Sequence, residues 1–305
     1  MGSTPVNDLI SGFGAYMRRT GRSRSSVEQY MQFLPLFAEW VGDRDLGDIT
    51  AAMIENDYLA GWWTRFEDRR GHEPKPNTVR AHLQALRSLY KYADRFDFIV
   101  DETGRPLRNP ALKLELPKIR RQIKPWVTAG ELDKMLEACL TEDERFLVAW
   151  LWMTAMRQGE ASKVPWANVD LSTQPGSILI TDSKTDGRRI TLLPELRVFV
   201  QQHLARQRER GLADPSTPVW CSRHGKGITE QQANRTLKRI AARAGLTKKV
   251  SCHSLRRGWA MTALERGMST EAIADHLGNE PQTTATYYAR VQRSQVEAEV
   301  VQAFG

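Results

Sequence analysis

The stretch from Cys252 to Ala260 holds the residues whose types and spacing are best suited to chemistry. His253 and Arg256 are three positions apart, so a helix would carry them on one face. The planar guanidinium of an arginine can bind two phosphate oxygens at once and stays charged at neutral pH. A histidine can donate a further hydrogen bond or move a proton. The pair therefore indicates an anion site, although basic residues on a helix are more often solvated or paired.

Arg157 and Lys184 are further candidates for contact with an anion. Arg157 follows the strongly apolar segment Phe146–Met156, where an unpaired charge would be costly. Glu160 is suited either to an ordinary ion pair with Arg157 or to orienting its guanidinium toward a phosphate. Lys184 lies beside Asp186-Gly187, a hairpin-turn signal that places the lysine near a tip, where it is usually mere surface.

The first part of the chain is predicted to be a small bundle of helices. Apolar residues recur at helical spacing, and no strand signal precedes residue 170. The last of these helices carries Arg80, Arg87 and Lys91, which could lie on DNA or form a solvated face with about equal weight. The predicted helices cover about residues 1–20, 25–40, 51–66 and 77–93.

The chain is predicted to form two domains joined by a basic linker. Its 305 residues agree with two domains of ordinary size. Proline-containing pairs and the cations Arg120 and Arg121 mark residues 116–125 as the linker, which could wrap a duplex or act as a solvated hinge. A helical, DNA-binding domain then covers residues 1–115, and a second domain covers residues 126–305.

The second domain is predicted to be mostly helical, with a small antiparallel sheet. Ser177–Ile180 and Arg188–Leu192 are the segments with a clear strand pattern, and they flank the turn near Lys184. From Arg223 to Val250, many basic residues face the single acid Glu230, which favours contact with nucleic acid over a solvated face. The cations of the helix predicted at about residues 229–244 include Arg235, Lys238 and Arg239.

The composition narrows the class of protein. The net charge of +8 and the pI of about 9.5 indicate a polyanionic partner, most often nucleic acid, or else a mildly basic protein without one. Three scattered cysteines argue against a disulfide framework and against a zinc site. No apolar run is long enough to span a membrane and no signal-peptide pattern is present, so a cytoplasmic location is expected.

The order of these residues resembles that of the tyrosine recombinases, the phage integrase family. The resemblance covers nearly the whole chain and rests on three motifs, Thr154–Glu160, His253–Arg257 and the Leu277–Tyr287 region. It implies a mainly α fold, in which an N-terminal helical bundle, the SAM-like core-binding domain, precedes a mostly helical catalytic domain with a small antiparallel sheet. The two domains would close around duplex DNA.

The resemblance implies a site-specific recombinase that cuts and rejoins DNA without a metal or another cofactor. Tyr287 would attack the phosphodiester and form a 3′-phosphotyrosyl bond, while Arg157 and Arg256 hold the non-bridging oxygens. Lys184 would protonate the leaving 5′ oxygen, and His253 would act as general base or phosphate ligand. The implied partners are duplex DNA with inverted half-sites, a second copy of the chain on one site, a tetramer in synapsis, and accessory proteins.

Two departures from the family pattern leave alternatives open. Asn279 stands where the family usually has His or Trp, and His276 is a weaker candidate for that role. Counted from the Thr-Thr pair the nucleophile is Tyr287, which we prefer, whereas counted from the glycine before Asn279 it is Tyr288. A DNA-binding regulatory or architectural protein that has lost cleavage is the alternative function, and a type IB topoisomerase would share the chemistry.

Overall fold

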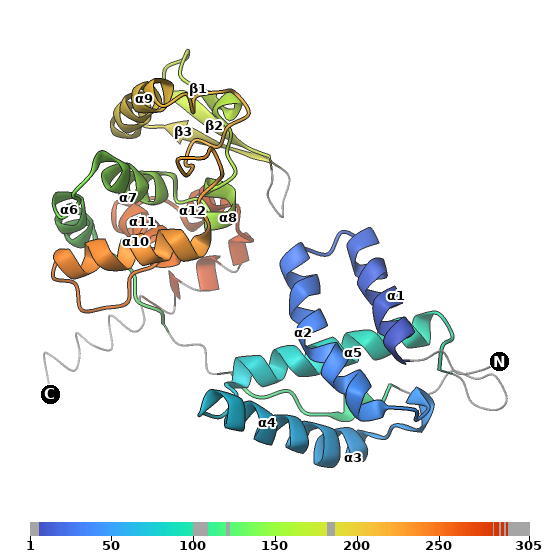
Figure 1. Ribbon diagram of the computed structural model, residues 1–305. Helices are drawn as coiled ribbons and strands as arrows, with labels where there is room; N and C mark the ends of the chain where they lie inside the picture. Colours follow the sequence, from blue (N-terminus) through green and yellow to red (C-terminus); the bar gives the residue numbers. More distant parts are fainter. Residues whose placement is uncertain are drawn as a thin grey trace, which may run out of the picture. The chain divides into compact units, whose positions relative to one another are not determined.

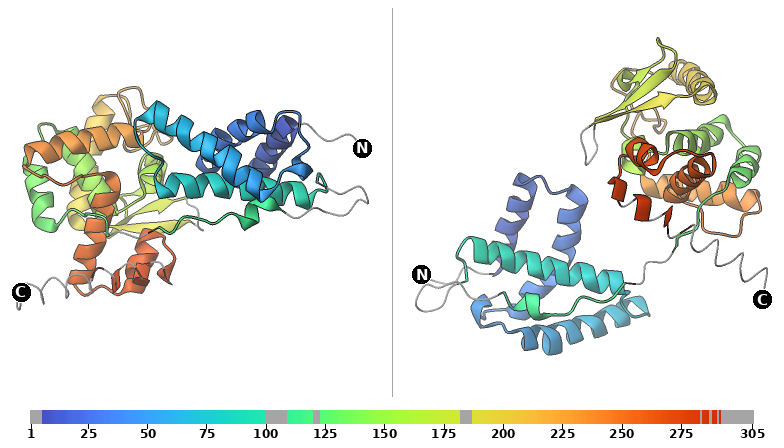
Figure 2. Two further views of the ribbon diagram at one scale, coloured as in Figure 1. Left: turned by 90° about the horizontal axis from the view of Figure 1, so that it is seen from below. Right: turned by 180° about the vertical axis from the view of Figure 1, so that it is seen from behind.

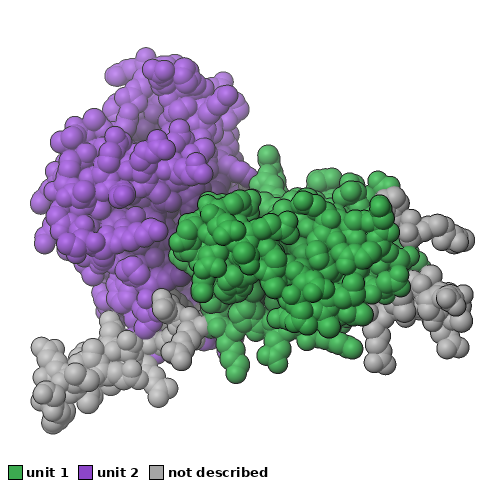
Figure 3. All heavy atoms as spheres, turned by 60° about the horizontal axis from the view of Figure 1, so that its bottom comes forward, with its two compact units in different colours: residues 1–121 green, residues 122–305 purple. Residues whose placement is uncertain are grey.

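The chain folds into two compact units, residues 1–121 and residues 122–305, which Figure 3 shows in different colours. The boundary between the units falls inside the basic segment 116–125 that the sequence indicates as a linker. The structure is a computed structural model that describes residues 6–99, 109–119, 123–181, 187–282, 284–286, 288, 289 and 291.

The described part of unit 1 is entirely helical, as the sequence predicts. Its elements are α1 (Val6–Arg19), α2 (Arg24–Val41), η1 (Leu46–Asp48), α3 (Ala51–Met53), η2 (Ile54–Leu59), α4 (Ala60–Arg70), α5 (Pro76–Arg95) and η3 (Pro110–Lys113). α1 and α2 pack on one side of α5, and the helical run from α3 to α4 lies on the other side (Figures 1 and 2). Phe37, Tyr58 and Leu86 lie fully buried in the core between these layers.

Short polar residues and a proline determine where the helices of unit 1 begin. The side chains of Ser23 and Thr50 accept hydrogen bonds from the backbone N–H groups of Ser26 and Met53, which satisfies donors at the first turns of α2 and α3. Pro76 opens α5, where a missing N–H costs nothing. The helix expected at residues 51–66 is present but extends further, because α3 continues through the π-helical turn η2 into α4, which ends at Arg70.

Unit 2 is mostly helical around a small sheet, in agreement with the predicted fold class. Its helices are α6 (Ala129–Glu137), α7 (Glu142–Thr154), α8 (Gln158–Ala161), η4 (Trp166–Asn168), α9 (Pro194–Glu209), α10 (Glu230–Arg243), α11 (Cys252–Glu265) and α12 (Thr270–Leu277). The strands are β1 (Val169–Asp170), β2 (Gly176–Ile180) and β3 (Arg188–Leu192). Helix α7 is buried nearly all round and contacts α6, α9, α10 and α11, so it is the centre of the unit.

The sheet is antiparallel and has the strand order β1-β2-β3. β2 and β3 are the two predicted strands, and they pair with Ile178 opposite Ile190 in the buried layer. β1 adds a third strand that the sequence does not indicate, because two residues are too few to show an alternating pattern. The β2–β3 connection holds the predicted position of Lys184, but residues 182–186 lie outside the described part of the chain.

Candidate active site

Arg157 is placed by a sharp turn at the end of the buried helix α7. The helix ends at Thr154, and Ala155 takes the left-handed conformation (φ 46°) that turns the chain back toward the protein. Arg157 then caps the short helix α8. Its backbone N–H donates to Oε2 of Glu160 at 2.9 Å, and its Nη1 donates to Oε1 of the same carboxylate at 2.9 Å. Glu160 therefore both starts α8 and pairs with the guanidinium, a contact that both sequence interpretations predict.

Arg256 reaches the same place from α11, the helix that also carries His253. Its side chain is buried, and its donors go to backbone carbonyls, with Nη1 2.7 Å from the oxygen of Ala155 and Nη2 2.7 Å from that of Leu277. Burial and, to a smaller extent, the nearby charge of Arg157 lower the pKa of Arg256 to about 9, and Glu160 opposes this shift. The guanidinium thus keeps its charge at neutral pH.

The two arginines meet at Asn279, which follows α12. Nη2 of Arg157 and Nη2 of Arg256 each lie 2.9 Å from Oδ1 of Asn279. Arg157 also donates from Nη2 to the carbonyl of Gly278 at 2.5 Å. Two predicted site residues, Arg157 and Arg256, therefore meet at an oxygen atom of a third, Asn279. Arg157 lies about a hundred positions or more before the other two in the sequence.

His253 lies one helical turn before Arg256 on α11 and is exposed to solvent. Desolvation by neighbouring protein atoms lowers the pKa of its imidazole; Glu230 opposes this shift, and Arg256 adds to it. The ring is therefore mostly neutral at pH 7. A neutral imidazole offers one donor and one acceptor, which suits either proton transfer or a hydrogen bond to a phosphate oxygen.

The two remaining predicted catalytic residues, Lys184 and Tyr287, lie outside the described residues. The competing tyrosine, Tyr288, is described. It is buried in the cluster formed by Ala155, Ala260 and Leu277. It is also close enough to Arg256 that its phenolate would raise the pKa of the guanidinium, although burial is the largest influence on that pKa. Tyr288 is thus positioned beside one of the two predicted phosphate-binding arginines.

Arg188 is a member of this cluster that the sequence analysis did not select. Its Nη2 lies 2.7 Å from Oε2 of Glu160 and its Nη1 3.1 Å from Oε1, while its Nε donates to the carbonyl of His276 at 2.9 Å. The sequence holds one signal for Arg188, because it is two and four positions from Ile190 and Leu192 and so shares their buried face of the predicted strand, where an arginine requires a partner.

His276, the weaker candidate for the role of Asn279, does not reach the arginine donors. Its ring stacks on Trp259 with centroids 4.1 Å apart. Burial lowers the pKa of His276 to about 4, and a backbone hydrogen bond with Thr154 opposes this shift. The imidazole is therefore a neutral packing group at pH 7. Its backbone carbonyl, which binds Arg188, is the part that supports the site.

The predicted DNA-binding cations fall into two groups. Those on α10, Arg235, Lys238 and Arg239, are exposed, and Lys91 of α5 is exposed as well. Arg80 instead donates to the carbonyl of Pro117 at 3.5 Å. Arg87 donates to the carbonyls of Ala111, Leu112 and Leu114 in the segment after α5. Arg120 and Arg121 lie outside the described residues.

The described residues contain no group of three or more His, Cys, Asp or Glu side chains that could hold a metal ion. No helix in this part of the chain is long and apolar enough to cross a bilayer.

Comparison with known proteins identifies the family. Residues 125–295, more than half of the chain, match the phage integrase family. The chain belongs to this family. The matched residues include Arg157, Arg256, Asn279 and both candidate tyrosines. The family match therefore covers the part of unit 2 in which the two arginines converge.

Curated relatives of this phage integrase-family chain are tyrosine recombinases. It is similar to tyrosine recombinase XerD of Listeria innocua, with 25% identity over 298 residues that cover 94% of this chain and 95% of the relative. It is also similar to tyrosine recombinase XerC of Xanthomonas campestris pv. campestris, with 26% identity over 276 residues that cover 88% of this chain and 79% of the relative.

Solved structures show the same fold at low sequence identity. XerH site-specific recombinase bound to a palindromic difH substrate has a TM-score of 0.70 at 17% identity, covering 99% of this chain and 98% of its own. A lambda integrase tetramer bound to a Holliday junction has a TM-score of 0.67 at 17% identity, and the match covers 94% of this chain and 77% of the lambda integrase chain. The tyrosine recombinase fold expected from the sequence is thereby confirmed.

Proposed function

We propose that this chain is a site-specific recombinase that cleaves and rejoins DNA strands through a 3′-phosphotyrosyl intermediate. The observation that carries the proposal is the convergence of Arg157 and Arg256 on one oxygen atom, that of Asn279. Two forked cations aimed at one point can hold the non-bridging oxygens of a single phosphate. Their charge stabilises the negative charge that grows on these oxygens as a strand is displaced.

The remaining catalytic roles are assigned to His253, Lys184 and a tyrosine. His253 lies exposed on the same helix as Arg256, where its neutral ring can accept the phenol proton or bind a phosphate oxygen. Lys184, on the connection between β2 and β3, protonates the departing 5′ oxygen. The phosphotyrosyl bond conserves the energy of the broken phosphodiester, so a 5′ hydroxyl can reseal the strand.

The nucleophile is one of two adjacent tyrosines. The Thr-Thr pair favours Tyr287, whereas the position of Tyr288 beside Arg256 supports the alternative. Tyr288 is buried against the cluster that surrounds Leu277, so it would have to turn outward to attack a phosphate.

The proposed partners are duplex DNA with inverted half-sites and further copies of the chain, as a dimer on one site and a tetramer in synapsis. XerH is bound to a palindromic substrate, and lambda integrase forms a dimer on a core site and a tetramer on a Holliday junction. On unit 2, we assign DNA contact to the exposed cations of α10, namely Arg235, Lys238 and Arg239. Whether the chain serves integration, excision or dimer resolution is set by its target sites.

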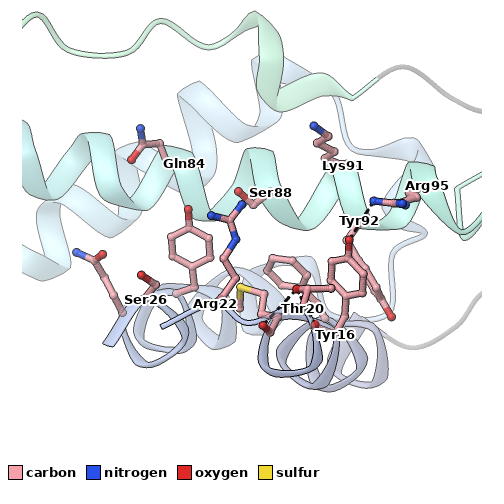
Figure 4. A pocket seen from close by; sticks show the side chains of 13 residues that line it. Tyr16, Thr20, Arg22, Ser26, Gln84, Ser88, Lys91, Tyr92 and Arg95 are labelled. Carbon is pink, nitrogen blue, oxygen red and sulfur yellow. Dashed lines mark hydrogen bonds between the residues drawn. The ribbon is translucent and has the colours of Figure 1, made fainter. Parts of the chain in front are cut away.

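In unit 1, a polar groove is the proposed contact with DNA. The groove has a volume of about 550 Å³ and runs between α5 and the α1–α2 pair (Figure 4). Arg22, Lys91 and Arg95 line it, and Arg95 donates to the hydroxyl of Tyr16 at 3.1 Å. These cations are exposed, whereas Arg87, also on α5, donates to carbonyls of the segment after that helix. The groove is therefore better suited to phosphates than the neighbouring Arg80 and Arg87.

The test is a suicide substrate, a cognate duplex nicked so that cleavage releases a short fragment and traps the covalent adduct. The cognate site can be selected from random duplexes by binding. Wild-type protein should form the adduct, and Arg256→Lys should slow it by ~10²–10³-fold, as for removal of one oxyanion donor. Tyr287→Phe should abolish the adduct if Tyr287 is the nucleophile, and Tyr288→Phe should do so if Tyr288 is. Specific binding without an adduct in the wild type would overturn the proposal and indicate a DNA-binding regulator.

A further inference from the structure

Asn279 occupies a fixed position between the two arginines. It follows Gly278, whose left-handed conformation (φ 60°) ends α12, and its backbone N–H donates to the carbonyl of Ala274 at 2.9 Å. Gly278 is packed against Arg188, since an added Cβ would lie 2.8 Å from its Nη1. The backbone before Asn279 is therefore held on both sides, which places its short side chain within reach of both arginines.

The orientation of the Asn279 amide follows from its neighbours. Arg157 and Arg256 both present N–H donors, so only the carbonyl oxygen can face them, and it accepts from each at 2.9 Å. An amino group in that place would set donors against donors. Asn279 thus acts as an acceptor for the guanidinium groups, which a protonated histidine at this position could not do.

The acceptors around the guanidinium of Arg256 are neutral, and this preserves its charge. Arg256 binds the carbonyls of Ala155 and Leu277 in addition to Asn279. The carboxylate in the cluster, Glu160, binds Arg157 and Arg188 but forms no hydrogen bond with Arg256 in the described structure. Asn279 therefore accepts from both guanidiniums without adding a negative charge, and Glu160 is the carboxylate that pairs with Arg157.

We propose that Asn279 is a positioning residue that sets the spacing of the Arg157 and Arg256 guanidiniums for one phosphate while adding no negative charge of its own. The inference rests on the proposed function for its catalytic meaning, but the spacing itself is a property of the protein without DNA. In this role the Asn279 side chain accepts hydrogen bonds from the arginines, instead of donating one to the phosphate. The role requires both an oxygen atom at this position and a side chain without charge.

Three variants separate these two requirements. Asn279→Ala removes the acceptor, and the nearly isosteric Asn279→Asp keeps the acceptor but adds a negative charge. Asn168→Ala is the matched control, because the amide of Asn168 binds the carbonyl of Leu179 and forms no hydrogen bond with either arginine in the described structure. Circular dichroism and thermal unfolding establish that each variant is folded.

The first measurement needs no DNA. Phenylglyoxal modifies accessible guanidinium groups, and peptide mass spectrometry gives the rate for Arg157 and Arg256 separately. We expect modification of Arg157 to become several times faster in Asn279→Ala, because its Nη2 loses an acceptor, and to remain at the wild-type rate in Asn279→Asp and Asn168→Ala. Equal rates in Asn279→Ala and wild type would overturn the positioning role, whether or not the chain cleaves DNA.

The second measurement is the single-turnover rate of adduct formation on the suicide substrate. Asn279→Ala should lower the rate at saturating protein by ~10–100-fold, as expected for misplaced reacting groups, with little change in the protein concentration that half-saturates the substrate. Asn279→Asp should lower the rate at least as much, although its arginines stay protected, because its carboxylate compensates their charge. Wild-type cleavage by Asn279→Asp would overturn the requirement for a neutral acceptor. A wild-type protein that forms no adduct would contradict the proposed function, and the labelling result would still decide the positioning role.

Discussion

Glu160 and Arg188 form a two-point ion pair, with the two closest N–O distances at 2.7 and 3.1 Å. Both side chains are buried, at 4% and 9% exposure. Burial alone would raise the pKa of the Glu160 carboxyl, but hydrogen bonds from Arg188 and Arg157 outweigh it and hold the pKa below its usual value. Since Glu160 also orients Arg157, the pair connects strand β3 to the cluster formed by Arg157, Arg256 and Asn279.

Removal of Arg188 is expected to destabilise unit 2. Arg188→Met leaves Glu160 buried with Arg157 as its remaining cation, and breaking a buried ion pair costs ~3–5 kcal/mol. The lower end of that range is expected, because Arg157 stays. Chemical unfolding of the full chain measures the loss of stability, and hydrogen exchange in α8 and β3 of the folded protein shows where it falls.

Arg210→Met is the control for this prediction. Arg210 pairs with Asp143 at 2.9 Å, but both side chains are about half exposed, and such pairs contribute ~0–1 kcal/mol. Equal effects of the two substitutions would show that the Glu160–Arg188 pair has no special weight in the stability of unit 2.

Gly258 sets the position of the helix that carries His253 and Arg256. A Cβ added there would lie 2.0 Å from the carbonyl oxygen of Val127 and 2.4 Å from the ring of Trp152. Gly258→Ala should therefore displace α11, cost ~1–3 kcal/mol or more through overpacking, and slow adduct formation. Thermal unfolding and the single-turnover rate measure the two effects. Gly130→Ala, with nothing within 4 Å of the added Cβ, should leave both measurements close to wild type.

His82 is expected to make unit 1 sensitive to acid. Its ring is fully buried and Nε2 lies 2.7 Å from the hydroxyl of Tyr58; burial lowers the pKa of His82 to about 3. The unfolded chain, with a histidine pKa of ~6.5, binds the proton more readily. The stabilisation is therefore complete above pH 6.5 and is lost as the pH falls toward 3, which amounts to about 2 kcal/mol between pH 7 and pH 5.

Hydrogen exchange in α5 at pH 7 and pH 5, corrected for intrinsic rates, tests this expectation. In His82→Gln the opening free energy of α5 should change less between the two pH values than in wild type. The exposed His72 provides the control, because His72→Gln should keep the wild-type pH dependence. An unchanged pH dependence in His82→Gln would show that His82 takes up no additional proton on unfolding.

Much of the candidate site could be predicted from the sequence, because the site depends on the types of its side chains. Arg157, Arg256 and Asn279 stand in short motifs, and the structure brings them together. Arg188 was missed because its partner Glu160 lies 28 positions away, and the strand pattern that turns the arginine inward does not show which carboxylate it meets. The carbonyl groups that bind Arg256 are equally invisible, because every residue type carries one.

The sequence predicts the elements in which apolar residues recur over several turns or along a full strand. It does not predict features that depend on contacts between distant parts of the chain. The helices of unit 1 and the β2–β3 pair follow from apolar spacing, but β1 is too short to show any. The basic residues of α5 illustrate the second limit. Arg87 and Lys91 are one turn apart and alike in charge, yet Arg87 binds carbonyls after α5 while Lys91 lines the polar groove. A sequence pattern cannot separate a cation that binds backbone from one that faces solvent.

This difference on α5 predicts how DNA affinity depends on salt. Each phosphate contact releases counterions, which contributes ~0.9 to the slope of log K against log salt on duplex DNA. Lys91→Ala and Arg95→Ala should each reduce the magnitude of the slope by up to about that amount, because both residues line the polar groove. Fluorescence anisotropy with a labelled cognate duplex over a range of salt concentrations measures the slope.

Arg87→Ala is the matched comparison, because it removes the same charge from the same helix. Its guanidinium holds the carbonyls of Ala111, Leu112 and Leu114, so its loss should leave the slope nearly unchanged and destabilise unit 1 instead. Hydrogen exchange in the 109–119 segment measures that destabilisation. A slope that falls in Arg87→Ala but not in Lys91→Ala or Arg95→Ala would place the DNA-contacting face of unit 1 on the Arg87 side of α5 and would exclude the groove.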